Sequence, residues 1–185
     1  MKDIINIKDI ENIKRLESEY DLEKASLLER KLRLMIRENP DLKPLRKKLR
    51  ELIVDYEDRE WSQLDKISDL QIEKSSIAEE LINQEQMFVQ KRKDAIRKKL
   101  KEFDMTQQEL GVLLGHSKSY MSELINGVSR FSLKDLVIIH KMLGISLKIL
   151  IPTFLQSDTK NQVIESISRL NKPKLKKRQK ALLTS

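Results

Sequence analysis

The scarcity of chain-breaking residues is the feature that most limits what this sequence can fold into. Its 185 residues include only four glycines and four prolines, whereas leucine, isoleucine, lysine and glutamate are abundant. Glycine and proline are the residues that interrupt helices, so their rarity favours long helical stretches. Aromatic residues make up only 4% of the chain, and its cores must therefore be mainly aliphatic. The sequence predicts an all-α protein.

Aliphatic residues recur at helical spacing through the first third of the chain. Residues 10–36 predict one long amphipathic helix, or two helices with a break near Tyr20 and Asp21. Prolines at positions 40 and 44 interrupt the pattern, and a second helix is expected over residues 45–56. The short connection favours an antiparallel helical hairpin over residues 1–60. Because two helices alone bury little, we expect the hairpin to dock on a partner or on a second copy.

Three further segments complete the expected organisation. Residues 61–86 predict a helical arm that is either a connecting helix or a short coiled coil, because the apolar spacing is looser than a heptad. Residues 87–155 are expected to form a five-helix domain, whose first helix has Ile96, Leu100 and Phe103 on one side. Residues 156–185 end in a basic tail with no acid after position 165, a composition typical of a segment that is disordered until it binds.

Charge is distributed unevenly between the two halves of the chain. Residues 1–86 carry 17 Lys and Arg against 21 Asp and Glu, whereas residues 87–185 carry 20 against 8. This asymmetry indicates that the second half faces a polyanion. A membrane surface would need a basic amphipathic helix with a large apolar face. Residues 95–100 come nearest, but their apolar side chains are needed to pack a small domain, so we expect a nucleic acid and no membrane partner.

Cysteine is absent, and histidine occurs only at positions 116 and 140. Disulfides, thiolate nucleophiles and cysteine-ligated zinc are therefore excluded. Two separate histidines make no metal site, and we interpret His116 and His140 as helix-surface or core residues. No catalytic triad or phosphate loop is recognisable, so we predict no enzyme, no cofactor and no metal. The missing cysteine, the charged first residues and the absence of a long apolar stretch indicate a cytoplasmic protein.

Residues 105–152 carry the strongest local signals in the sequence. Thr106 with Glu109, and Ser132 with Asp135, have the spacing of helix-capping boxes, and Ser117 can cap a helix between them. Glycines that follow the first two helices can adopt the left-handed conformation that ends a helix. The expected inward positions are Leu110, Leu113, Leu114, Met121, Leu124, Ile125, Leu136, Ile139 and Leu143. The pattern predicts a helix-turn-helix.

The second helix of such a motif lies in the DNA major groove, with its N-terminal residues facing base edges. Lys118, Ser119 and Tyr120 are the expected base readers, because they can form hydrogen bonds there, although Tyr120 could instead shield the turn. Gln107 and the free amides of its helix can reach a phosphate. The candidate DNA-binding residues are Thr106, Gln107, Ser117, Lys118, Ser119, Tyr120, Ser122, Asn126 and Arg130.

This segment resembles the Cro/repressor class of helix-turn-helix (XRE-like), which typically shows T-Q-x-E-L-A, then L-G, then S-x-S-x-I-S-x-x-x-x-G. The matching residues are Thr106, Gln107, Glu109, Leu110, Leu114, Gly115, Ser117, Ser119, Met121, Ser122 and Gly127. Several different constraints recur together over more than 20 residues, so the match is specific. The resemblance implies a compact helical domain that binds operator double-stranded DNA as a homodimer.

A narrower resemblance is to HigA-type antitoxins. The stretch KSYMSELINGVSRFSLKDL is similar to that family's K-S-x-V-S-E-x-L-x-G-K-R-x-L-S-L, and the N-terminal helices are similar to its dimerising or toxin-facing region. The resemblance implies an antitoxin of a type II pair that neutralises a small, basic, ribonuclease-like toxin and represses its own operon. The sequence departs from the family at Val128 and Ser129, which replace the usual basic pair, in its longer arm and in its basic tail.

Two other functions are compatible with the same features. A free-standing Cro-like repressor would use its N-terminal helices only for dimerisation. A helical adaptor would use the same fold to bind proteins and no DNA, because a fold does not by itself determine function. The adaptor predicts no salt-dependent retention on DNA, whereas the two regulators differ in whether a toxin gene lies beside this one.

Overall fold

The computed structural model describes residues 10–63, 67–155 and 157–179, and every regular element within these ranges is helical. The predicted all-α fold is confirmed. The chain divides into two compact units, Met1–Leu150 and Ile151–Ser185. The first contains α1 (Glu19–Met35), α2 (Lys43–Glu60), α3 (Asp69–Glu102), α4 (Gln107–Leu114), α5 (Lys118–Asn126), α6 (Leu133–Leu143) and α7 (Leu147–Leu150), and the second contains α8 (Ser157–Leu170) and α9 (Pro173–Arg178).

Helix α1 begins later than the apolar periodicity predicts. The Ser18 hydroxyl accepts a hydrogen bond from the backbone amide of Asp21 at 3.2 Å and caps the helix. The preceding apolar residues lie in a short 3₁₀ turn, Ile10–Asn12, and in irregular chain. Ile10 and Leu16 are nevertheless fully buried in the hairpin core. The predicted break near Tyr20 and Asp21 is therefore wrong by a few residues, because the periodicity there reflects burial rather than helix.

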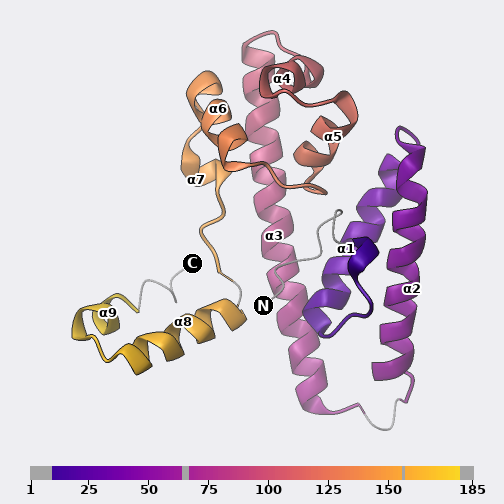
Figure 1. Cartoon of the computed structure of the whole chain (residues 1–185), viewed down its shortest axis with the longest axis vertical. Coiled ribbons are helices and arrows are strands. Elements are labelled where there is room, and N and C mark those ends of the chain that lie inside the picture. Colours follow the sequence, from indigo (N-terminus) through magenta and orange to yellow (C-terminus); the bar gives the residue numbers. More distant parts are fainter. Residues whose placement is uncertain (1–9, 64–66, 156, 180–185) are drawn as a thin grey trace. The chain divides into compact units, whose positions relative to one another are not determined.

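Helices α1 and α2 form the predicted hairpin, and α1 lies between α2 and α3 (Figure 1). The hairpin core is aliphatic and includes Leu22, Leu28, Leu32, Leu49 and Leu52. Helix α1 also packs against α3, whose Ala78 and Ile82 are buried. Glu85 of α3 accepts a hydrogen bond from the Tyr20 hydroxyl and forms an ion pair with Lys24. Part of the surface that the sequence leaves for a partner is thus covered by the chain's own third helix.

One buried carboxylate joins the ends of the hairpin helices. Glu19 Oε1 accepts hydrogen bonds from the Tyr56 hydroxyl at 2.9 Å and from the Trp61 indole N–H at 3.1 Å. Burial and the bond to Glu19 raise the pKa of Tyr56. Trp61 packs against the hairpin core and ends α2, as a packing residue rather than an exposed anchor.

Helix α3 is one continuous helix across the predicted boundary between the arm (residues 61–86) and the domain that begins at residue 87. It contains neither glycine nor proline over its 34 residues, and at about 1.5 Å per residue it extends roughly 50 Å. It begins at Asp69, where the Ser68 hydroxyl accepts a hydrogen bond from the Gln71 amide. The expectation of helix directly from Trp61 is wrong, because the described residues between α2 and Ser68 are irregular.

The C-terminal half of α3 packs with α4 to α7 around a second aliphatic core. Ile96, Leu100, Leu110, Met121 and Leu124 are among its buried members. Arg92 is also buried, with its guanidinium 5.1 Å from the Phe88 ring centre and 5.2 Å from that of Phe131, and burial lowers its pKa to about 10. Two predicted inward positions are wrong, since Leu113 is 42% exposed and Phe103 53% exposed.

The second unit contains α8 and α9. Helix α8 ends at Leu170, before the basic tail. The expectation of disorder is not met at Pro173–Arg178, which forms the short helix α9 with three basic residues in its last turn. None of the described helices is long and apolar enough to span a bilayer.

Residues that follow α5 join the hairpin to the helix-turn-helix. Val128 is buried in the hairpin core, and the Lys31 ammonium donates a hydrogen bond to the Gly127 carbonyl at 3.3 Å. Gly127 has a φ of +66°, and a Cβ added to it would lie 2.7 Å from Cγ1 of Val89. The chain must therefore pass close to both α1 and α3 at this point, and only glycine fits.

Alanine at Gly127 tests this close approach, with Gly144 as the matched control. Gly144 has the same φ of +66°, but nothing lies within 4 Å of the position a Cβ would take. We expect Gly144→Ala to cost about 1 kcal/mol of unfolding free energy from backbone strain, and Gly127→Ala about 2–4 kcal/mol from strain plus overlap. Urea unfolding measures both losses. Equal losses would show that the contact with Val89 is unimportant, whereas truncating Val89 to alanine should recover part of the difference.

Candidate nucleic-acid interface

Helices α4 and α5 form the predicted helix-turn-helix, and local chemistry determines where each begins. Thr106 and Glu109 make the expected capping box at α4, and the Ser117 hydroxyl accepts a hydrogen bond from the Tyr120 amide at α5. Gly115 ends α4 with a φ of +76°. These caps determine where α4 and α5 begin. The free backbone N–H groups at the two N-termini can donate hydrogen bonds to an anion.

A small residue on α4 allows the two helices to approach closely. A Cβ on Gly111 would lie 3.2 Å from the His116 carbonyl oxygen and 3.4 Å from Cβ of Met121. Any larger side chain at this position would push α5 away from α4 and change the geometry of the helix-turn-helix.

The predicted contact residues fall into three groups. Thr106, Ser117, Lys118, Ser119 and Arg130 are exposed at the helix starts or after α5. Gln107, Ser122 and Asn126 are half-buried and line a cleft that α5 shares with α1 and α3. Tyr120 belongs to neither set: it packs on the helix-turn-helix core, edge-on to His116 with ring centres 5.0 Å apart. Tyr120 thus packs beside the turn, and its part in base reading stays a prediction.

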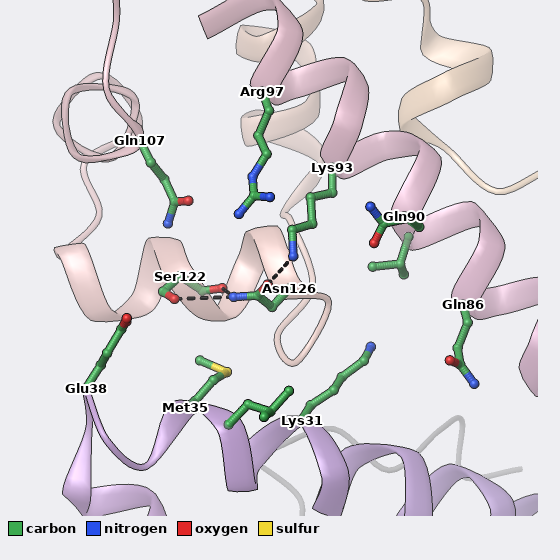
Figure 2. A pocket seen from close by; sticks show the side chains of 12 residues that line it. Lys31, Met35, Glu38, Gln86, Gln90, Lys93, Arg97, Gln107, Ser122 and Asn126 are labelled. Carbon is green, nitrogen blue, oxygen red and sulfur yellow. Dashed lines mark hydrogen bonds between the residues drawn. The ribbon is translucent and has the colours of Figure 1, made fainter. Parts of the chain in front are cut away.

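The cleft has a volume of about 430 Å³, and its side chains come from α1, α3, α4 and α5 (Figure 2). The Lys93 ammonium donates to Asn126 Oδ1 at 2.8 Å, and Asn126 Nδ2 donates to the Ser122 carbonyl at 2.9 Å. Arg97 and Gln107 project into the space beside them (Figure 2). The N-terminus of α4 therefore adjoins cations of α3, an arrangement that can hold a phosphate.

Sequence reasoning missed a hairpin residue that touches the reading helix. Asn39 lies between α1 and α2, and its Nδ2 donates a hydrogen bond to the Ser119 hydroxyl at 2.8 Å. In the sequence, Asn39 and the proline after it signal only a chain break. No local pattern connects it with a residue 80 positions later, so only the tertiary structure reveals the contact.

Positively charged side chains of α1 and α3 lie close together at the cleft. Burial, together with the neighbouring charges of Lys24, Arg92 and Lys93, lowers the pKa of Lys31 to about 8, and the charge of Glu85 opposes this shift. Burial and the charge of Arg97 likewise lower the pKa of Lys93. Docking of the hairpin thus brings a cation from α1 against cations of α3, which has an electrostatic cost.

The two histidines have structural partners. His116 Nε2 lies 3.1 Å from Oδ1 of Asp135, and His140 Nδ1 lies 2.7 Å from the Ile145 carbonyl. Within the part of the chain that the structure describes, no three side chains of the types that bind metals gather into a possible site.

The geometry defines a helix-turn-helix of the kind that binds DNA. A helix-turn-helix family model (HTH_3) matches residues 96–150, which comprise the end of α3 and all of α4 to α7. Residues 96–150 are thus a helix-turn-helix domain of the Cro/C1 type, and this domain points to a DNA-binding transcription regulator. No match was found among curated proteins or among solved structures.

Replacing Lys31 tests the cost of its burial. The pKa of Lys31 falls from 10.5 in the unfolded chain to about 8 in the folded one, so the unfolded state binds more protons between these values. The folded state is therefore penalised fully below pH 8, and the penalty disappears as the pH rises towards 10.5. After allowing for solvent screening, we expect Lys31→Met to raise the unfolding free energy by about 1–3 kcal/mol at pH 7.

Urea unfolding at pH 7 and pH 10 measures this gain and its loss. Lys141→Met, at an exposed lysine of α6, controls for the removal of one positive charge. A gain that persists unchanged at pH 10 would mean that the charge of Lys31 is not its cause.

Proposed function

We propose that this regulator reads operator double-stranded DNA with α5 in the major groove and the N-terminus of α4 at the phosphate backbone. The observation that supports this most directly is the capped α4–turn–α5 arrangement, which exposes Ser117, Lys118 and Ser119 at the start of the second helix. Cations on α3 adjoin Gln107 and can neutralise phosphates. Because one such domain contacts few base pairs, we propose a homodimer on half-sites about one DNA turn apart.

Alanine substitutions at Lys118 and Ser119 test the role of α5. Each should reduce the preference for the operator over random DNA by about 1–3 kcal/mol per lost base contact. Lys141→Ala, on an exposed part of α6, is the control and should leave the preference unchanged. Fluorescence anisotropy over a range of salt concentrations measures affinity and its salt slope. An unchanged operator preference in both variants would remove α5 from the reading role.

We further propose that the chain is the antitoxin of a type II pair and represses its own operon. The similarity of residues 118–136 and of the N-terminal helices to HigA-type antitoxins supports this proposal. A second support is the exposed surface at the end of α2, where Val54 is 53% exposed near the exposed acids Glu57 and Asp58, whereas Asp55 is paired with Arg59. An apolar residue within an acidic surface suits a ribonuclease-like toxin, which must be basic to hold RNA.

Co-expression with the product of a neighbouring small open reading frame tests the antitoxin role. The wild-type chain should restore growth and co-purify with that product. Val54→Lys should weaken the complex by about 1–2 kcal/mol, because it replaces an apolar contact with a positive charge that a basic toxin repels. Lys141→Glu, on the helix-turn-helix, should not weaken it.

If the chain binds its operator but no product of a neighbouring gene, it is a free-standing repressor and not an antitoxin. Failure to bind DNA at low salt as well would favour a helical adaptor.

A further inference from the structure

Helix α5 has one face available for DNA, and it is the face opposite its buried residues. Met121, Leu124 and Ile125 point into the helix-turn-helix core. At 3.6 residues per turn, Ser119 and Asn126 lie on the opposite side, with Ser122 beside them. Any approach of α5 to base edges must therefore use the side that carries Ser119 and Asn126.

The hairpin lies against this face. Asn39, in the turn between α1 and α2, donates a hydrogen bond to Ser119 at 2.8 Å. The cleft formed with the end of α1 has Ser122 and Asn126 in its lining, opposite Met35 and Glu38 (Figure 2). Directly after α5, Val128 is buried in the hairpin core. Three separate contacts thus place the hairpin along the length of the reading helix.

A DNA major groove cannot hold both elements. The groove is about 12 Å wide, and one helix with its side chains is about 10–12 Å across, so α5 alone fills it. The turn that contacts Ser119 would occupy the place of the base edges. We propose that the α1–α2 hairpin is an intramolecular lid on α5, and that it must leave α5 before the chain can read its operator. This inference rests on the proposed DNA-reading role of α5.

The contacts are of a kind that can be broken without unfolding either part. Asn39 and Ser119 meet at the surface, where a hydrogen bond contributes little net stability. The cleft is open and lined largely by polar side chains, and Lys31 meets like charges there. When they separate, each side keeps its own buried core apart from Val128, and α3 loses the cover that α1 gives to Ala78 and Ile82. The observed DNA affinity then equals the affinity of the open form multiplied by its population.

A reversible cross-link provides the direct test on the full-length chain. The natural sequence contains no cysteine, so Asn39→Cys with Ser119→Cys supplies the only two thiols. A short bismethanethiosulfonate reagent joins the two cysteines through two mixed disulfides with release of methanesulfinate, and a reductant removes it completely and restores both thiols. We expect the cross-linked protein to lose operator binding and to regain it after cleavage with a reductant. The two single-cysteine variants, treated in the same way, control for the loss of Ser119 and for the reagent.

A second measurement weakens the lid without touching a DNA-reading residue. Asn39→Ala removes the hydrogen bond to Ser119, and we expect it to raise operator affinity about two- to tenfold, the equivalent of one surface hydrogen bond. Asn12→Ala, at an exposed asparagine of the hairpin's first turn, is the matched control and should leave affinity unchanged.

The outcomes separate the lid from the reading role. Equal operator affinity before and after cleavage, with no gain from Asn39→Ala, would overturn the lid while leaving DNA reading by α5 intact. If neither the wild-type chain nor Asn39→Ala binds any DNA at low salt, the proposed function is wrong and the lid falls with it.

Discussion

The burial of Val128 in the hairpin core is the contact on which the arrangement of the first unit depends. Val128 follows the reading helix directly, so the residue that anchors the hairpin also determines where α5 ends relative to α1. Gly127 makes this possible, because its left-handed conformation turns the chain at a point where Val89 leaves no room for a Cβ. One apolar side chain and one glycine therefore link two cores that otherwise have separate members.

This link gives Val128 a structural role at a position where the HigA-type pattern that the segment resembles has a basic residue. A lysine or arginine there would reach towards phosphates, whereas valine is removed from solvent by the hairpin. Ser129 is also buried, and its hydroxyl donates a hydrogen bond to Glu123 at 2.9 Å. The departure from the pattern thus exchanges two possible phosphate contacts for attachment of the N-terminal helices.

Local chemistry made much of the helix-turn-helix predictable. Caps at Thr106, Ser117 and Ser132 and the glycine turns depend on residues within a few positions of one another, and the structure has each of them. Predictions of burial and of contacts between elements distant in the sequence were less accurate. Leu113 has the period of a buried residue, but its side chain is 42% exposed. The contact between Asn39 and Ser119 has no local signature, and therefore the sequence could not predict that the candidate site is shared with the hairpin.

Salt should act oppositely on the two occupants of the α5 face. DNA gains its affinity largely from released counterions, so its hold weakens as salt concentration rises. Next to α5 the hairpin is held by the burial of Val128 and by the neutral hydrogen bond from Asn39, neither of which depends on counterions. Salt screens the repulsion that Lys31 meets from Lys93 and Arg92, and it also screens the attraction between Lys24 and Glu85. Rising salt therefore favours the docked hairpin mainly by weakening the DNA that competes with it for α5. A chain whose hairpin cannot dock should show the salt slope of the phosphate contacts alone, and the difference between its slope and that of the wild-type chain measures the salt dependence of docking itself.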